Sequence, residues 1–467
     1  MSEPAWTNVP IKTAATSRAT GEAPVWDGAN AKAVDPNKCG LTMADITSRS
    51  DLKENAERKY EHQEPDRICV VLNNNGKLGS VYSQVARLLA RQGGWKRKRS
   101  TAGRFHMVFG EAGGSGIPFK RFSQVFRYDY GIKPLVNYNR NCKTITNKVM
   151  MTQTLQKHFR DNNVDQFLPE SFLFWPGRDD VSQRSAFETY CESRESVWIV
   201  KPSNEAHGNG IFLSSSRAEI LDHIDSQPEG SSPWVAQKYI SSPLLISGDR
   251  KFDIRVWVLL SHDYKVYVHE EGVLRTSSCT FDMSDLRNRY IHMTNHSIQS
   301  EHKDFGKHEE ANEILFSEFS SFLQEEKGVR FEETIKKQIH SIVKEVFVAA
   351  KPIMESIDDI DDYHSFMFFG FDMIVDSSCK VWLQEVNATP AISKMLLTTI
   401  SEDIIRTAIE PVFPRDGPES KNNAKNGFVL VYESDGKCDF VANMPAPETQ
   451  DDVNIEAFGS EGKKAKK

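Results

Sequence analysis

The stretch FGFDMIVDSSCKVWLQEVNATP, residues 369–390, carries two carboxylates and an amide on a short predicted hairpin. Its alternating apolar runs, FDMIVD and VWLQEVN, predict two strands, and DSSCK between them predicts the turn. If the hairpin closes about Ser378 and Cys379, Asp372 lies opposite Glu385, and Asn387 shares the face of Glu385. Two adjacent carboxylates repel each other unless a proton or a cation separates them, and three oxygen ligands suit Mg²⁺ carried by nucleotide phosphates. A solvated pair of acids is the alternative.

Length and composition indicate a globular protein. The 467 residues suffice for two or three domains, and 39% of them are hydrophobic. The sequence has no apolar run of about 18 residues, and its N-terminus lacks the apolar core of a secretory signal, so we expect a cytoplasmic protein without a membrane partner. The seven cysteines form no CxxC pair, which argues against a disulfide framework or a structural zinc site.

The charge is distributed unevenly along the chain. The net charge is −7, yet residues 91–150 contain 13 Lys and Arg against 2 Asp and Glu, so this segment carries +11 and the remainder −18. Its densest part, WKRKRS at residues 95–100, follows VYSQVARLLARQGG, which predicts an amphipathic helix. Such a surface attracts polyanions, and both nucleic acids and acidic protein tails qualify. A solvated basic face is the alternative.

The pattern of elements predicts an α/β chain. Residues 1–65 lack periodicity, and we expect them to form a disordered extension. We expect strands in RICVVLNNNG, RFHMVFGE, FLPESFLFW, VWIVKPSNEAHGNGIFLSSS, WVAQKYI, KFDIRVWVLL, KVYVHEEGVLRT and FVLVY. We expect helices in NKVMMTQTLQKHF and in a long stretch from about Ala311 to Met354.

A lysine and a glycine-containing loop follow one predicted strand. Lys201 ends VWIV, and the loop PSNEAHGNG contains Gly208 and Gly210. Glycines let backbone amides approach phosphate oxygens, and a lysine adds a point charge. The spacing fits neither the Walker A motif nor the dinucleotide fingerprint, and an ordinary hairpin turn is the alternative.

Charged residues alternate along the predicted strand KFDIRVWV. Lys251, Asp253 and Arg255 share one face, and the other face is apolar. A solvated outer face is the alternative. Further along, EEGVLRT contributes Arg275, and HMTNHS contributes two polar residues near a strand end. His292 and His296 lie four residues apart without a third spaced ligand, so we expect them to be structural.

Taken in order, these motifs resemble the tubulin-tyrosine ligase family, whose members have an ATP-grasp fold. The matching stretches are WIVKPSNEAHGNGIFLSSS, QKYISSPLL, RKFDIRVWVL, EGVLRT, HMTNHSIQ and FFGFDMIVDSSCKVWLQEVNATPA. VYSQVARLLARQGGWKRKR and PLVNYNRNCKTITNK extend the resemblance to residues 67–415. It implies an α/β (α+β) fold, an ATP-grasp fold with a small N-terminal α/β domain. The expected parts are the extension 1–65, a basic tubulin-binding domain 66–136, a central ATP-grasp domain 137–239, a C-terminal ATP-grasp domain with the metal site 240–416, and a polar tail 417–467 with one short strand.

The resemblance also implies roles for individual residues. Asp372, Glu385 and Asn387 would coordinate Mg²⁺, and Arg255, Arg275 and Glu385 would be catalytic. The residues that would bind ATP are Lys201, His207, Gly208, Gly210, Gln237, Lys238, Tyr239, Ile240, Lys251, Asp253, Thr294 and Asn295. His207 stands where the family usually has Lys or Arg, so a phosphate contact there would depend on pH.

The reaction that the resemblance implies is ATP-dependent amide formation. Free L-tyrosine would be joined to the C-terminal glutamate of detyrosinated α-tubulin through an acyl phosphate, with ATP and Mg²⁺ required. The partner would be the acidic α-tubulin tail rather than a nucleic acid, and the location cytoplasmic and cytoskeleton-associated. Two alternatives stay open: a glutamate or glycine ligase of the same family, and an inactive microtubule-binding protein with a ligase fold.

Overall fold

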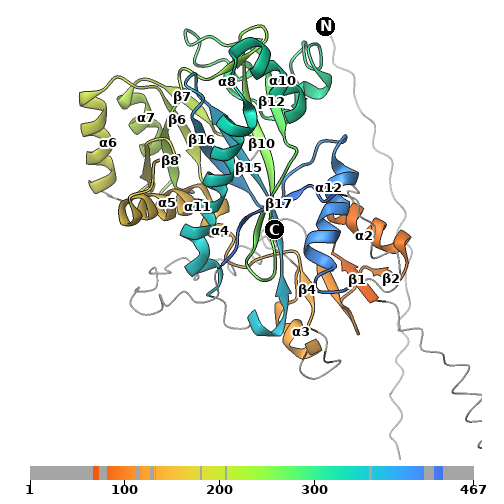
Figure 1. Ribbon diagram of the computed structural model, residues 1–467. Coiled ribbons are helices and arrows are strands. Elements are labelled where there is room, and N and C mark those ends of the chain that lie inside the picture. The colour runs from red at the N-terminus through yellow and green to blue at the C-terminus, as the bar shows by residue number, and fades with distance from the viewer. Residues whose placement is uncertain are drawn as a thin grey trace, which may run out of the picture. The chain divides into compact units, whose positions relative to one another are not determined.

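The computed structural model describes residues 67–72, 81–110, 116–126, 131, 133–178, 181–205, 208–356, 360–414 and 425–434. The chain divides into two units, Met1–Glu64 and Pro65–Lys467, and the elements below belong to the second unit (Figure 1). The expected extension and His207 lie outside the described residues, as does most of the polar tail. No helix in the described part of the chain is long and apolar enough to cross a membrane.

A five-stranded sheet contains the first strands of the chain. Its order is β14-β4-β3-β1-β2, and every pairing is parallel. The strands are β1 (Arg67–Val71), β2 (Trp95–Lys98), β3 (Met107–Phe109), β4 (Leu135–Val136) and β14 (His364–Ser365), and the accompanying helices are α2 (Val81–Gln92) and α3 (Phe119–Gln124). Val81, Val85 and Leu89 of α2 are buried, as its apolar periodicity predicts. The densest basic residues form β2 at the sheet edge, which the sequence did not predict.

A four-stranded antiparallel sheet lies in the middle of the sequence. Its order is β5-β8-β6-β7. The strands are β5 (Ser171–Phe174), β6 (Trp198–Pro202), β7 (Phe212–Ser214) and β8 (Trp234–Lys238), and the helices of this part are α4 (Lys143–Thr146), α5 (Lys148–Asn162), α6 (Val181–Ser193) and α7 (Arg217–Asp225). Phe187 of α6 packs on Trp198 with ring centroids 5.0 Å apart, within the core of this sheet.

The largest sheet is built around β10 (Arg250–Leu260), which is buried at every position. β10 pairs with β15 (Met367–Val375) and β9 (Leu245–Ile246) along one edge, and with β12 (Val273–Thr280) and β11 (Val266–His269) along the other. The sheet also contains β13 (Glu313–Leu315), β16 (Val381–Asn387) and β17 (Phe428–Tyr432). The remaining helices are α8 (Arg289–His292), α9 (His296–Gln299), α10 (Phe316–Lys327), α11 (Lys337–Met354) and α12 (Leu397–Ile404), with π-helical turns at Glu332–Lys336 and Ile405–Ile409 and 3-10 turns at Glu310–Asn312 and Ile360–Asp362.

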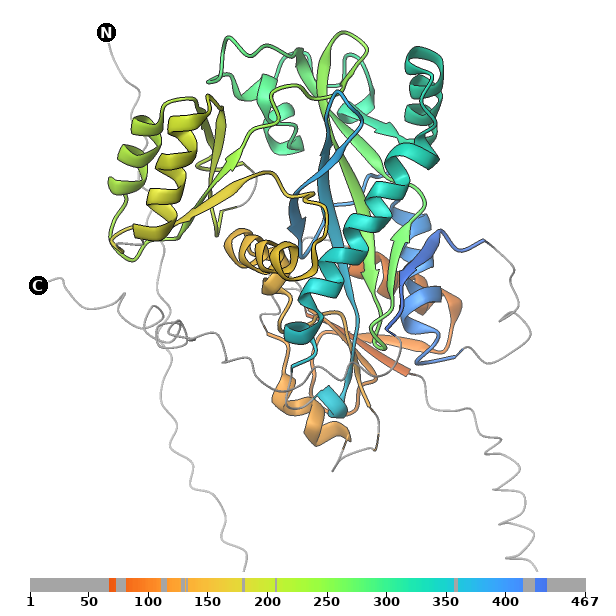
Figure 2. The same ribbon diagram turned by 60° about the vertical axis from the view of Figure 1, so that its left-hand side comes forward.

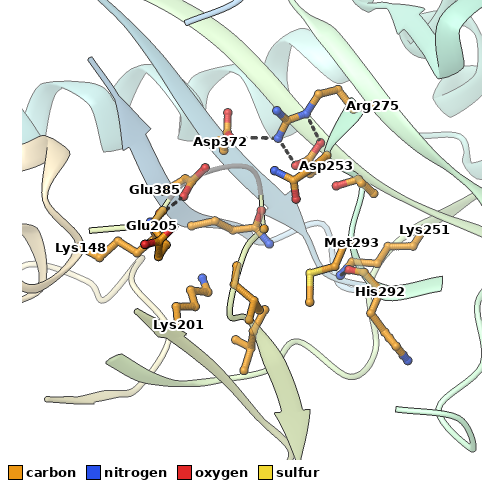
Figure 3. A pocket seen from close by; sticks show the side chains of 16 residues that line it. Lys148, Lys201, Glu205, Lys251, Asp253, Arg275, His292, Met293, Asp372 and Glu385 are labelled. Carbon is orange, nitrogen blue, oxygen red and sulfur yellow. Dashed lines mark hydrogen bonds and ion pairs between the residues drawn. The ribbon is translucent and has the colours of Figure 1, made fainter. Parts of the chain in front are cut away.

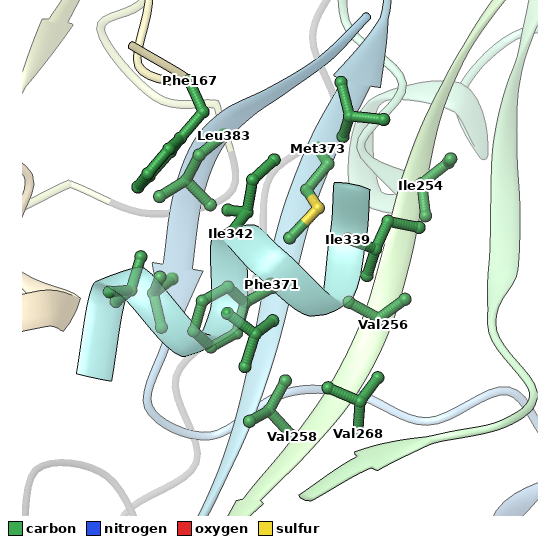
Figure 4. Packing of buried hydrophobic residues seen from close by; sticks show 14 of the residues in the cluster. Phe167, Ile254, Val256, Val258, Val268, Ile339, Ile342, Phe371, Met373 and Leu383 are labelled. Carbon is green, nitrogen blue, oxygen red and sulfur yellow. The ribbon is translucent and has the colours of Figure 1, made fainter. Parts of the chain in front are cut away.

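Helix α11 covers one face of this sheet, as the teal ribbon in Figure 2 shows. Ile339 and Ile342 of α11 belong to the same buried cluster as Val256 of β10 and Phe371 of β15 (Figure 4). This packing removes a large apolar surface from water and fixes β10 beside β15.

The helical stretch expected from about Ala311 to Met354 is helical over most of its length, but it begins later and is interrupted. Ala311 and Asn312 have left-handed φ values of 55° and 56°, and the chain then forms β13. α10 ends at Gly328, whose φ of 65° gives the left-handed cap that often terminates helices. The expected stretch therefore contains two helices, α10 and α11, preceded by β13.

Candidate active site

The β15–β16 hairpin brings the predicted metal ligands together. Asp372 pairs with Glu385, as predicted, but the turn is centred on Ser378, with Val375 opposite Val381. A β-bulge between Asp372 and Met373 shifts the register by one residue and brings Glu385 opposite Asp372. The Asn387 amide nitrogen Nδ2 lies 3.1 Å from Oδ2 of Asp372 and 3.3 Å from Oε1 of Glu385. All three side chains therefore converge within hydrogen-bonding distance.

The charged face of β10 lies inside the protein. The exposed fractions are 3% for Lys251, 3% for Asp253 and 8% for Arg255, so the solvated-face alternative is wrong. Lys251 and Asp253 line the pocket described below, and Arg255 lies behind that lining. Buried charges at such positions require partners.

Two arginines pair with the buried carboxylates of Asp372 and Asp253. Arg255 makes a bidentate pair with Asp372, through Nε to Oδ1 and through Nη2 to Oδ2 at 2.7 Å. Arg275 binds both carboxylate oxygens of Asp253, with Nε 2.8 Å from Oδ1, and its Nη2 lies 3.0 Å from Oδ2 of Asp372. Burial raises the pKa of Asp372, but the charges of Arg255 and Arg275 outweigh burial, and the pKa lies well below its ordinary value. Asp372 is therefore ionised at neutral pH.

Two lysines are buried in the same region. Lys201 Nζ donates to Gln237 Oε1 at 2.9 Å, and Lys251 Nζ donates to Tyr239 OH at 2.9 Å and to the carbonyl of His292 at 2.7 Å. Burial lowers the pKa of Lys201 to about 8 and that of Lys251 to about 7. Each group is thus poised to gain a proton when an anion binds beside it.

These residues surround one pocket (Figure 3). It contains about 580 Å³ of empty space, part of it open to solvent. Its lining residues are Lys148, Ile199, Lys201, Glu205, Gly208, Ile211, Lys251, Asp253, Arg275, His292, Met293, Thr294, Asn295, Asp372, Gln384 and Glu385. Most of this lining is charged or polar, and the apolar residues are Ile199, Ile211 and Met293, so the pocket suits a charged ligand.

Other predicted residues lie behind the lining. Arg255, Gln237 and Tyr239 each hold a lining side chain, as described above. The Lys238 side chain points elsewhere, with Nζ 3.5 Å from Tyr190 OH, and Ile240 is not part of the lining. The structure therefore brings most of the predicted residues together and gives the side chain of Lys238 a different environment.

The two predicted glycines have conformations that other residues rarely adopt. Gly208 has a φ of 78°, and a Cβ there would lie 2.6 Å from Cδ1 of Ile298. Gly210 has a φ of 68°, and a Cβ there would lie 3.1 Å from Cγ of Pro202. The loop requires both glycines, and of the two only Gly208 lines the pocket.

Lys148 is a lining residue that the sequence analysis missed. It begins α5, donates from Nζ to the Glu205 carbonyl at 2.9 Å, and lies 3.6 Å from Oε2 of Glu385. Asn147 caps the helix by accepting from the backbone amides of residues 149 and 150. A cation in the first turn opposes the helix dipole, so a lysine directly after an N-cap was the available signal.

The donor set fits a Mg²⁺ ion carried by phosphates. Mg²⁺ prefers oxygen ligands, and in nucleotide sites the protein typically supplies one or two carboxylates. Asp372 and Glu385 supply two, and rotating the Asn387 amide would present its oxygen in place of Nδ2. Within the described residues no group of three or more His, Cys, Asp or Glu is arranged to hold a metal by itself.

Comparisons with known proteins agree with the geometry. The model of the tubulin-tyrosine ligase family matches residues 129–421, which is more than half of the chain. Tubulin glycylase 3C of Tetrahymena thermophila is 31% identical over 253 residues, covering 51% of this chain and 23% of that protein. Tubulin glycylase 3D of the same organism is 30% identical over 258 residues, covering 52% and 24%. The probable tubulin polyglutamylase ttll-9 of Caenorhabditis elegans is 26% identical over 279 residues, covering 57% and 64%.

The match to each glycylase covers about a quarter of that protein, although it covers half of this chain. The family match includes every predicted metal ligand and every predicted catalytic arginine. The fold is mixed α/β, as predicted, and the matched family has an ATP-grasp-like fold. The chain belongs to the tubulin-tyrosine ligase family.

Proposed function

We propose that this protein is an ATP-dependent ligase that joins the amine of an amino acid to a carboxylate of tubulin. The observation that carries the proposal is the pairing of Asp372 and Glu385 with a set of cations around one pocket. Those cations are Lys148, Lys201, Lys251 and Arg275. A polyphosphate and a divalent cation together would complement both charge types.

The chain's own residues would act mainly by binding and orienting. Lys148, Lys201 and Lys251 would hold ATP phosphates, with Gln237 and Tyr239 fixing the positions of the two buried ammonium groups. Asp372, Glu385 and Asn387 would hold Mg²⁺, which when bound neutralises phosphate charge. Two anions about 4 Å apart repel by about 4 kcal/mol at an effective dielectric constant of 20, so cations are needed around reacting anions. Arg275 is placed to supply one of them.

The relatives favour glycine or glutamate over tyrosine as the amino acid. Three relatives with 28–31% identity are named tubulin glycylases, and one with 26% identity is named a probable tubulin polyglutamylase. We therefore place glycine first and glutamate second, and the expected tyrosine reaction third.

The basic edge strand supports tubulin as the partner. Lys96, Arg97 and Lys98 of β2 are exposed. A glutamate-rich protein tail would be attracted to them over about 8 Å at physiological ionic strength. A cytoskeletal location would follow from this partner.

One incubation tests the proposal. The full chain, ATP, Mg²⁺ and tubulin are combined with labelled glycine, glutamate or tyrosine in parallel, and protein-bound label is counted. We expect ATP-dependent incorporation of glycine or glutamate and none without Mg²⁺. Incorporation of tyrosine alone would restore the original prediction, and no incorporation of any label would favour the inactive microtubule-binding alternative.

A further inference from the structure

A second, smaller pocket adjoins the first on the side of Arg275. It contains about 180 Å³ of empty space, partly open to solvent, and shares Arg275 and Thr294 with the larger pocket. Its other lining residues are His296, Gln299, Ala311, Asn312 and Glu313. The shared residues place this space next to the group proposed to hold reacting anions.

Glu313 is an uncommitted carboxylate in this pocket. It lies on β13 directly opposite Arg275 of β12, so the two side chains share a face of the sheet. The Arg275 guanidinium is nevertheless engaged by Asp253 and Asp372. Within the described part of the chain, no hydrogen bond or ion pair holds the Glu313 carboxylate, although the residue is half-buried.

The backbone before Glu313 is held firmly. Ala311 and Asn312 both have left-handed φ values, which cost energy for residues other than glycine. The Asn312 amide donates to the Thr276 carbonyl at 2.9 Å and to Ser278 Oγ at 3.0 Å, and its oxygen accepts from the Gly306 amide at 2.7 Å. These three bonds fix the turn that delivers Glu313 to the pocket.

We propose that Glu313 binds the ammonium group of the incoming amino acid and accepts its proton. This inference rests on the proposed ligase function. A ligase of this kind needs such a group, because the amine of a free amino acid is largely protonated at neutral pH and cannot attack until the proton leaves. Glu313 lines the same pocket as Arg275, so the amine would be held beside the activated carboxyl group.

The step balances in atoms and charge. ATP would first transfer its γ-phosphoryl group to the tubulin carboxylate, giving an acyl phosphate and ADP. The ammonium would then pass one proton to the Glu313 carboxylate, and the resulting amine would attack the acyl carbon. The bond from that carbon to the phosphate oxygen breaks as the amide C–N bond forms. Inorganic phosphate leaves, and the second amine proton and the Glu313 proton pass to solvent.

Hydroxylamine separates amine recognition from carboxylate activation. It is largely uncharged at neutral pH, so it attacks an acyl phosphate without a carboxylate to bind or deprotonate it, and the product is a hydroxamate. We would compare the wild type, Glu313→Gln and the control Glu310→Gln, using labelled amino acid in one assay and hydroxylamine in the other. Glu310 is an exposed acid of the same turn and lies outside both pockets.

Glu313→Gln is expected to raise the KM for the amino acid by about tenfold to a hundredfold, the range expected for loss of a charge-assisted hydrogen bond. It is also expected to lower kcat for ligation, because glutamine cannot accept the proton of the amine. Its hydroxamate formation should equal that of the wild type, and Glu310→Gln should match the wild type in both assays. Unchanged ligation by Glu313→Gln would overturn the inference. Equal loss of ligation and hydroxamate formation would also overturn it, because Glu313 would then act in activation or in folding.

Two further measurements test the position of the Glu313 carboxylate and the proposed ligase function separately. Glu313→Asp keeps the charge but shortens the side chain, so an intermediate KM is expected, and a wild-type KM would contradict a position-specific contact. If the wild type itself forms neither hydroxamate nor labelled protein, the proposed ligase function fails before Glu313 is tested.

Discussion

Glu385 differs from Asp372 in how firmly the protein holds it. Asp372 is buried against two arginines, whereas the Glu385 side chain is 26% exposed and lies 3.6 Å from Lys148 Nζ. We predict that Glu385→Gln keeps the fold but lowers ligation by about 100-fold or more, because it removes a charge proposed to bind Mg²⁺. Label incorporation would measure activity, and the thermal midpoint would report on folding.

The matched control for that variant is Glu310→Gln, which removes an exposed acid outside the pocket and should leave both measurements unchanged. Normal turnover by Glu385→Gln would refute the metal assignment.

The two buried lysines predict a pH dependence of ATP binding. Burial lowers the pKa of Lys201 to about 8 and that of Lys251 to about 7, so both lose protons as the pH of the free protein rises through this range. Bound phosphates favour the charged forms and raise both pKa values. ATP binding is therefore expected to take up protons between pH 7 and 9, and affinity is expected to fall as pH rises.

Calorimetric titrations in two buffers with different ionisation heats would measure this uptake. Lys251→Met should reduce the uptake at pH 8, while Lys344→Met, at an exposed position on α11, should not. A buffer-independent heat in the wild type would contradict the prediction.

Local alternation predicted the two strands of the hairpin and the pairing of Asp372 with Glu385. The observed turn by itself would place Gln384 opposite Asp372, and the β-bulge that brings Glu385 there was not predicted. The environment of Lys148 could not be predicted in this way, because its contact with Glu385 joins residues 237 positions apart in sequence by a tertiary approach of α5 to β16. The same holds for Glu313, whose place opposite Arg275 depends on a turn with two left-handed residues.

At the scale of elements, α11 is the main cover of the large sheet. The Phe347 ring lies 5.6 Å from that of Phe369 and 6.1 Å from that of Phe371, with no exposed surface. We predict that Phe347→Ala lowers the free energy of unfolding by about 3–5 kcal/mol, as for other large-to-small changes in cores. Urea unfolding followed by circular dichroism would show a lower midpoint.

Lys344→Ala, on the exposed side of the same helix, should change the free energy of unfolding by less than about 0.5 kcal/mol. Equal midpoints for the two variants would mean that α11 does not stabilise the sheet.

Periodicity predicted most strands and helices but failed where a chain reversal depended on single residues. The apolar pattern indicated a helical stretch over 311–354 but not its interruptions, which depend on Ala311, Asn312 and Gly328. The sequence did not predict the strand β2, because WKRK has no apolar alternation. This strand forms by pairing with β1. The alternation in β10 predicts its charged face, but the burial of that face depends on Asp372 of β15 and Arg275 of β12, which pair with Arg255 and Asp253.

For the whole molecule, the exposed basic residues of β2 predict how the substrate arrives. Reversing the charges of Lys96, Arg97 and Lys98 is expected to raise the KM for tubulin by about tenfold at low salt and to leave ATP affinity unchanged. Added salt should shrink the difference, because it screens exposed charges. Steady-state ligation at several salt concentrations would measure both effects.

The control reverses three exposed lysines on α10 and α11, namely Lys327, Lys337 and Lys344. It changes the net charge equally, so an equal rise in KM would trace the effect to total charge and not to β2. If neither change affects the KM for tubulin, the basic residues of β2 form a solvated surface without a role in binding tubulin.

The buried charges of β10 also predict which residues of such proteins can change during evolution without loss of the fold. Losing Arg255 would leave Asp372 buried without its bidentate partner, so that exchange damages folding as well as chemistry. Losing Glu385 or Lys148, which are partly exposed, would damage chemistry alone. Gene copies that become inactive are therefore expected to keep the arginine–aspartate pairs and to diverge first at these two positions. An intact pair in a relative thus reports an inherited fold, and its activity is better judged from the residues at the pocket rim.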